Sequence, residues 1–154
     1  MKNIKSLYIG KGVQIKISKG NVLNFDRNVY IDDYCRLECA GGNIHIGEET
    51  YINMRTNIVA LKKICIGKMC IFGPGIGIYD HNHKYANKDI AIKNQGYETE
   101  TVIIGDDVWL GTNCIITKGV QITDRCIIGA NSVVTKNIEN SGVYGGIPCK
   151  HIKN

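Results

Sequence analysis

Aliphatic residues recur at every sixth position through the C-terminal third of the chain. The series consists of Ile104, Leu110, Ile116, Ile122, Ile128 and Val134. Four positions after each comes a small or apolar residue, in the series Val108, Cys114, Val120, Cys126, Ser132 and Ile138. A helix turns 100° per residue, so steps of six and four would scatter these positions around its axis. In an extended chain they share one parity and point to one side, which predicts short strands with one buried face.

Each hexad also contains a position at which the chain must turn. The intervening same-parity positions hold mostly polar residues: Asp106, Thr112, Lys118, Asp124, Ala130 and Lys136. One hexad is therefore one short flat face followed by a corner, and three hexads close a triangular coil. The stacking pairs predicted in this way are Ile104 on Ile122, Leu110 on Ile128 and Ile116 on Val134. The sequence predicts an all-β fold, a parallel β-helix.

Weaker turns of the same pattern precede this region and extend the prediction to a single domain over residues 1–154. Their aliphatic positions are Phe25, Ile31, Leu37, Ile46, Ile52, Ile58, Ile66, Phe72 and Ile78. The small inward positions include Cys35, Cys70, Cys114 and Cys126. Cysteine is a compact hydrophobe, so packing explains these four better than redox chemistry does. The strand-like pattern begins near Leu7.

The periodicity breaks once, over residues 80–101, which are polar and contain no hexad. A β-helix accommodates such an insertion as a loop ejected at a corner, and long loops in compact folds are often functional. Two of the four histidines, His81 and His83, stand at the start of this loop beside Asp80. Histidine titrates near neutrality and serves as a general base, so the loop root is the candidate site.

Composition and charge narrow the function further. The chain has a formal net charge of +5, but its lysines are scattered and accompany no nucleic-acid motif. An anionic small ligand suits this charge at least as well, so no nucleic-acid partner is expected. No signal peptide, apolar stretch long enough for a membrane span, or paired zinc-ligand spacing is present. We therefore expect a soluble, cytoplasmic protein without a metal.

These features together resemble the hexapeptide-repeat acyltransferases, especially galactoside and maltose O-acetyltransferases and the O-acetyltransferases of surface-polysaccharide synthesis. The resemblance covers about residues 44 to 153. It rests on the Ile-Gly hexads, the loop root YDHNH at 79–83, the run IGDDVWLG at 104–111 and the segments IGANSVVTK at 128–136 and GGIPCK at 145–150. It implies a left-handed triangular prism, a homotrimer with active sites between subunits, and acetyl-CoA as co-substrate.

The resemblance also assigns roles to residues. His83 matches the catalytic histidine, which removes the proton from the acceptor hydroxyl, and a backbone N–H near Gly111 and Thr112 matches the oxyanion donor. Asn53, 30 residues before His83, matches the asparagine that holds the acceptor, while His81 and Asp80 are expected to steer the acceptor or orient the base. The expected coenzyme-binding residues are Trp109, Gly111, Thr112, Ala130, Thr135, Lys136, Lys150 and Lys153.

The resemblance predicts acetyl transfer to a sugar hydroxyl, and three other functions compete with it. The galactoside enzymes have a pair of acids where this chain has Ala60 and Leu61, so we expect an acceptor from a surface polysaccharide or its precursor. An N-acetyltransferase acting on an amino sugar is the nearest alternative. A γ-class carbonic anhydrase would need a third suitably spaced histidine, and an ice-binding surface would need ranks of threonine that the chain lacks.

Overall fold

The chain folds into a parallel β-helix with three flat sheets, described by a computed structural model for residues 6–154. Sheet A contains β1 (Leu7–Ile9), β4 (Val29–Ile31), β7 (Tyr51–Ile52), β10 (Ile71–Phe72), β15 (Trp109–Leu110), β18 (Cys126–Ile128), β20 (Gly142–Gly145) and β21 (Lys150–Lys153). Sheet B contains β2 (Gln14–Ile17), β5 (Arg36–Cys39), β8 (Asn57–Ala60), β11 (Gly77–Tyr79), β16 (Ile115–Ile116) and β19 (Val133–Val134). Sheet C contains β3 (Leu23–Phe25), β6 (Asn43–Ile46), β9 (Lys63–Ile66), β14 (Val102–Ile104) and β17 (Gln121–Ile122).

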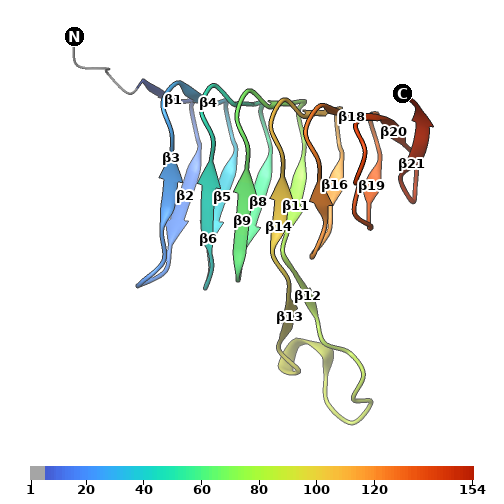
Figure 1. Ribbon diagram of the computed structural model, residues 1–154. Helices are drawn as coiled ribbons and strands as arrows, with labels where there is room; N and C mark the ends of the chain where they lie inside the picture. Colours follow the sequence, from blue (N-terminus) through green and yellow to red (C-terminus); the bar gives the residue numbers. More distant parts are fainter. Residues whose placement is uncertain (1–5) are drawn as a thin grey trace.

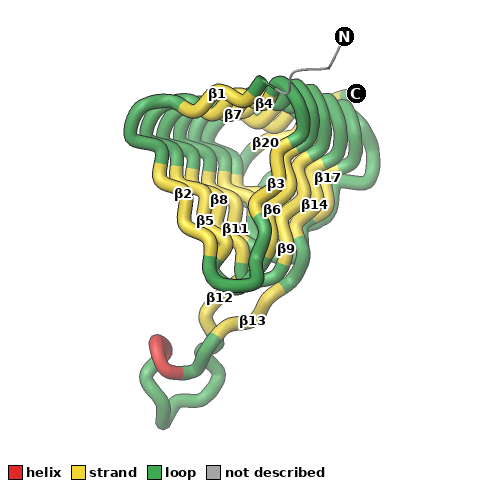
Figure 2. The backbone as a smooth tube through the Cα atoms, turned by 90° about the vertical axis from the view of Figure 1, so that its left-hand side faces the viewer, coloured by secondary structure: helices red, strands yellow, loops and turns green. Residues whose placement is uncertain are grey.

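The coil winds with a left-handed sense. Successive coils stack side by side from the N-terminal to the C-terminal end (Figure 1). Seen from the N-terminal end, the chain runs counterclockwise from sheet A through sheet B to sheet C while it recedes from the viewer (Figure 2). A path that recedes counterclockwise is a left-handed screw, which is rare among parallel β-connections. The left-handed triangular prism expected from the resemblance is confirmed.

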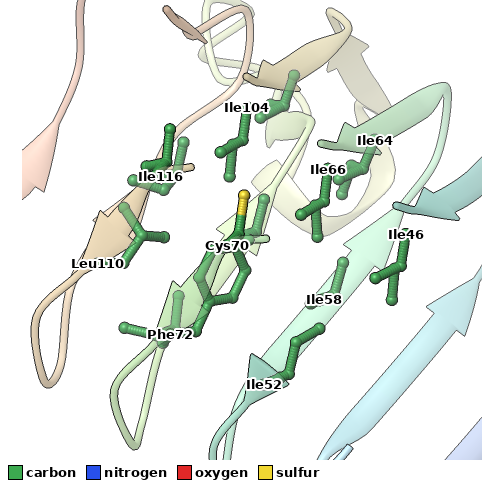
Figure 3. Packing of buried hydrophobic residues seen from close by; sticks show 14 of the residues in the cluster. Ile46, Ile52, Ile58, Ile64, Ile66, Cys70, Phe72, Ile104, Leu110 and Ile116 are labelled. Atoms are coloured by element: carbon green, nitrogen blue, oxygen red, sulfur yellow. The ribbon is translucent and has the colours of Figure 1, made fainter. Parts of the chain in front are cut away.

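The interior is a stack of aliphatic side chains in register from coil to coil (Figure 3). The predicted pairs are confirmed, because Ile104 pairs with Ile122, Leu110 with Ile128 and Ile116 with Val134. The four predicted inward cysteines are all buried, and burial raises the pKa of each of their thiols. Burying one large aliphatic side chain contributes roughly 1.5–3 kcal/mol, so every coil is fixed by its own inward residues.

The corners turn through residues in left-handed backbone conformation. Asn28, Tyr34, Glu49, Arg55, Met69, Asp107, Asn113, Arg125 and Asn131 all have φ between 54° and 59°. Only a few of these are Asn, the non-glycine residue that adopts this conformation most readily. The regular hydrogen bonds between adjacent coils therefore hold these corner residues in the left-handed conformation, which most of them rarely adopt.

The insertion at 80–101 is a β-hairpin rather than an irregular loop. Strand β12 (His81–His83) pairs antiparallel with β13 (Tyr97–Thr99), and a single 3-10 turn, η1 (Ile92–Asn94), lies in the connection. The hairpin projects from the corner between sheets B and C, away from the coil (Figures 1 and 2). The prediction of an ejected segment is confirmed, and its strand pairing is an addition to that prediction.

The described part of the chain has no helix that is both long enough and apolar enough to span a bilayer.

Candidate functional site

The residues expected at the site lie on two corners of the triangular coil. The AB corner joins sheet A to sheet B and contains Asn53, Thr112 and Ala130, each directly after a sheet A strand or the glycine that follows it. The BC corner joins sheet B to sheet C and contains the hairpin root with His83 and, at the C-terminal end, Lys136. Sheet B separates the two corners within one chain (Figure 2).

A column of glycines runs along the AB corner. Gly73, Gly111 and Gly129 occupy the same place in three successive coils, linked by hydrogen bonds from each N–H to the coil above. A Cβ on Gly73 would lie 2.8 Å from the Thr112 nitrogen, and one on Gly111 would lie 2.6 Å from the Ala130 nitrogen. Real Cβ contacts are not that short, so the coils stack this closely only because these residues have no side chain.

The backbone N–H groups of this corner change partners along the coil. Toward the N-terminal end each one donates to a side-chain oxygen: Lys11 to Asp33, Asp33 to Asp32, and Met54 to Asn53. Thr112 and Ala130 follow glycines, so the preceding residue has no oxygen to offer. Within residues 6–154 their N–H groups make no hydrogen bond, and both residues are exposed. Two backbone donors of this corner are therefore uncapped.

Asn53 presents its amino group at the same corner. Its Oδ1 accepts a hydrogen bond from the Met54 N–H at 2.8 Å, which orients the amide. The Nδ2 group is then the atom left to meet a ligand, and it can only donate. An amide fixed in this way would bind a lone pair of an acceptor hydroxyl and leave the hydroxyl proton free for a base.

Asp80 is placed differently from the prediction. Its side chain is 0% exposed, and its two oxygens accept hydrogen bonds from the N–H groups of Leu61, Lys62 and Lys63 at 2.7–2.8 Å. It takes the inward position that Ala60 occupies in the coil below, because Tyr79 pairs with Val59. A carboxylate turned into the coil does not face an acceptor, so of the two expected roles the orientation of the base suits Asp80 better.

The two histidines of the hairpin differ in their surroundings. They alternate along β12 and so lie on one face of the hairpin, with Tyr97 directly across from His83. His81 is only 16% exposed at its side chain, with its Nδ1 3.2 Å from Asp80 Oδ1. His83 is exposed, and its ring lies over that of Tyr97 with centroids 4.6 Å apart. The imidazole open to a substrate is therefore that of His83.

The predicted coenzyme-binding residues divide between the two corners. Thr135 and Lys136 are exposed at the BC corner, in the last coil after β19. Lys150 and Lys153 are exposed on β21, and Lys150 pairs with Gly145 beyond Gly129 at the AB corner. Thr112, Ala130 and Lys150 therefore follow one another toward the C-terminal end of a single corner, while Lys136 belongs to the other.

Trp109 lies on the outer face of sheet A at the edge of the AB corner. It is 51% exposed and stands in register between Ile71 and Ile127. These three residues line a depression of about 330 Å³ together with Asp107 and Arg125. Asp107 and Arg125 lie in the turns from sheet C to sheet A, so this depression is on the side of Trp109 away from the AB corner.

Residues 6–154 contain no group of three or more histidine, cysteine or acidic side chains arranged to hold a metal ion. His45, the remaining histidine considered for a carbonic anhydrase site, lies on sheet C. Its ring contacts Asn24 and Asp26 there.

Two residues at the site escaped the sequence prediction. Tyr97 lies 14 positions after His83, and only the strand pairing of the hairpin brings the two rings together. Gly73 belongs to the glycine column, but the hairpin insertion separates it from its neighbour Gly111 by 38 positions. The sequence pattern therefore does not show that the two glycines are neighbours. The parity of Asp80, two residues after the inward Ile78, was the available signal that its side chain points into the coil.

Comparisons with known proteins agree with this architecture. The family model for the bacterial transferase hexapeptide (six repeats) matches residues 101–136. The chain is 30% identical over 139 residues to the "Putative lipopolysaccharide biosynthesis O-acetyl transferase WbbJ" of Escherichia coli (strain K12), a match that covers 85% of this chain and 71% of the relative. The chain spans between 50% and 57% of the length of the first three curated relatives that it matches.

Two solved structures represent the similar folds. A galactoside acetyltransferase in complex with coenzyme A superimposes with a TM-score of 0.74 at 31% identity, covering 86% of this chain and 64% of that one. A point mutant of AntD, an N-acyltransferase from Bacillus cereus in complex with dTDP and coenzyme A, gives a TM-score of 0.74 at 26% identity, with 99% and 85% covered.

Proposed function

The chain belongs to the hexapeptide-repeat acyltransferases, and from that premise we propose that it transfers the acetyl group of acetyl-CoA to a hydroxyl of a carbohydrate. The observation that carries the proposal is the AB corner, where two uncapped backbone N–H groups stand in line with a fixed asparagine amide. The single exposed imidazole of the hairpin root supplies the base.

The AB corner fits the long, narrow arm of a coenzyme A thioester. The glycine column leaves one position of the corner without a side chain in three successive coils, and the Thr112 and Ala130 N–H groups match carbonyl oxygens of the ligand. Lys150 stands exposed toward the C-terminal end of the same corner, where it would pair with a nucleotide phosphate. The similarity to solved structures with bound coenzyme A supports this assignment of the ligand.

The chemistry follows from the donors and the base. The acceptor oxygen attacks the thioester carbonyl carbon while the His83 imidazole takes the hydroxyl proton. The Thr112 N–H donates to the oxyanion of the tetrahedral intermediate, which is the group that develops charge. As the intermediate collapses, the carbon–sulfur bond breaks, and the imidazolium returns its proton to the departing thiolate. The products are an acetyl ester and coenzyme A.

The separation of the two corners supports a site shared between copies of the chain. Asn53 and Thr112 lie on the AB corner, whereas His83 lies on the BC corner, with sheet B between them. One chain therefore does not bring the base to the oxyanion donor. A closed trimer that sets the AB corner of one subunit against the BC corner of the next would complete three equivalent sites.

The acceptor proposed is a sugar unit of a surface polysaccharide or its precursor. Ala60, which stands where the galactoside enzymes have an acid, is buried and faces the interior, so it has no part in reading a sugar. The similarity to a relative named for lipopolysaccharide biosynthesis supports the same class. A second candidate, acyl transfer to an amino sugar, is supported by the similarity to an N-acyltransferase.

Paired acceptors separate these two candidates. The purified protein is incubated with acetyl-CoA and with matched hydroxy and amino sugars, and the product is identified by mass and by its lability to hydroxylamine. The proposal predicts an ester, which hydroxylamine cleaves. A stable amide would transfer the assignment to the second candidate, and the absence of any acetylated sugar across a broad acceptor panel would overturn both.

A further inference from the structure

Four side chains form a continuous run of contacts from the interior of the coil to His83. The buried Asp80 carboxylate contacts His81 at 3.2 Å. The His81 ring meets the Tyr97 ring edge-on with centroids 5.5 Å apart, and the Tyr97 ring lies over His83. We propose that the first three are positioning residues, which hold the His83 imidazole where the acceptor hydroxyl binds; the inference rests on the proposed function.

Asp80 is the fixed end of the run. Three backbone N–H groups of residues 61–63 bind its carboxylate, so the residue joins the hairpin root to the coil below. Hydrogen bonds to a buried carboxylate are among the stronger ones in proteins. A two-stranded hairpin alone is only marginally stable in water. The hydrogen bonds of Asp80 to the coil below therefore stabilise the root of the hairpin.

His81 links the fixed Asp80 carboxylate to Tyr97. The Asp80 carboxylate accepts only, so the His81 atom facing it, Nδ1, is the one that bears the proton when the ring is neutral. The ring also meets Tyr79 edge-on, with centroids 6.1 Å apart. With tyrosines at its edges and a carboxylate at Nδ1, the His81 ring is held in one orientation.

The opposite side of the hairpin is held by the coil above. Lys118 Nζ lies 3.7 Å from carboxylate oxygens of both Glu98 and Glu100 on or beside β13. Gly119, with φ of +78°, has the Glu100 side chain where its own Cβ would be. The hairpin root is therefore held from two adjacent coils, and the His83–Tyr97 pair stands directly beyond it.

This support matters because the His83 imidazole makes no hydrogen bond within residues 6–154, where its ring contacts that of Tyr97. An exposed imidazole without a partner samples several rotamers, and the ring of Tyr97 removes part of that freedom. A displacement of about 1 Å at a reacting group costs on the order of 10²-fold in rate. Tyr97 therefore affects turnover through the place of the imidazole and not through contact with acetyl-CoA.

The test compares Tyr97→Leu with Tyr97→Phe, which keeps the ring. We expect Tyr97→Leu to lower kcat about 10- to 100-fold, with the KM for acetyl-CoA unchanged, and Tyr97→Phe to retain most of the activity. In NMR spectra of the full protein, the His83 ring protons should lose the upfield shift caused by the Tyr97 ring in the Leu variant only. Unchanged kcat and unchanged His83 shifts in Tyr97→Leu would overturn the proposal.

The link to Asp80 is tested through His81→Phe, because changing Asp80 itself removes three backbone contacts and endangers folding. The Phe ring preserves the edge contact with Tyr97 but not the bond to Asp80, so we expect a lower kcat and broadened His83 resonances. Sharp, unshifted resonances with normal kcat would show that Asp80 positions nothing. The NMR readout needs no acceptor, so it decides the positioning role even if the wild-type protein acetylates no sugar and the proposed function fails.

Discussion

Replacing Gly73 with alanine tests the oxyanion donor through the glycine that packs against the Thr112 nitrogen. The new methyl group would lie 2.8 Å from the Thr112 nitrogen and 3.1 Å from the Gly111 carbonyl carbon. Either the methyl covers the N–H or the corner moves away, and both remove the donor from its place. Loss of one oxyanion donor costs about 10²–10³ in kcat, or about 2.7–4 kcal/mol. Overpacking of this size costs about 1–3 kcal/mol of folding stability.

The assay must separate the lost donor from a damaged fold. For a chain of this length each kcal/mol lowers Tm by about 2–4 °C, so kcat is measured well below the Tm of the variant. Gly129→Ala is the matched control for folding, because its Cβ would meet Tyr144 O at 3.4 Å, an ordinary contact. We expect Gly73→Ala to bind acetyl-CoA while losing turnover, and Gly129→Ala to keep the Tm of the wild-type protein. A folded Gly73→Ala protein with wild-type kcat would refute the assignment of Thr112 as the donor.

Three further predictions concern the shared site, the phosphate contacts and the buried thiols. Refolding Asn53→Ala and His83→Ala chains together should restore activity at about a quarter of the sites; if the mixture stays as inactive as its components, the site lies within one chain. Replacing both Lys136 and Lys150 with alanine should raise the KM for acetyl-CoA roughly 3- to 10-fold with no change in Tm, since exposed ion pairs contribute about 0.2–1 kcal/mol each. If the variant and the wild-type protein have equal KM values at low salt, the phosphates bind elsewhere. Burial raises the pKa of Cys70 to about 11, so at pH 8 its thiol stays protonated and iodoacetamide should label it only after unfolding. Labelling is followed by mass spectrometry, and rapid labelling of Cys70 in the native protein would contradict its burial.

The hexads predicted the coil well because every turn repeats the same constraint. Each strand must point its aliphatic residue inward, and the stacking partner lies eighteen positions on, so Ile104 and Ile122 could be paired from the sequence. The small inward positions followed in the same way, including Cys114 and Cys126. A local pattern therefore determined the register of most of the fold.

The candidate site was harder to predict because it lies where the repeat stops. The contact of His83 with Tyr97 depends on the pairing of β12 with β13, which no periodicity specifies. Asp80 has the appearance of a polar loop residue, yet its side chain fills an inward position and satisfies three backbone donors. Within the described part of the chain, the Thr112 N–H lacks a hydrogen-bond partner because Gly111 precedes it and Gly73 packs against it. These two glycines are neighbours in the fold but are separated in the sequence by the hairpin.

The central claim is that the His83 imidazole serves as the base for acetyl transfer to a sugar hydroxyl. Single-turnover rates of ester formation from acetyl-CoA are therefore compared for the wild-type protein and His83→Ala at saturating acceptor, with acetyl-CoA binding measured for both. Removal of a general base typically costs about 10²–10⁴ in rate, so the account predicts that fall with unchanged acetyl-CoA affinity. A His83→Ala protein that forms the ester at the wild-type rate would contradict it.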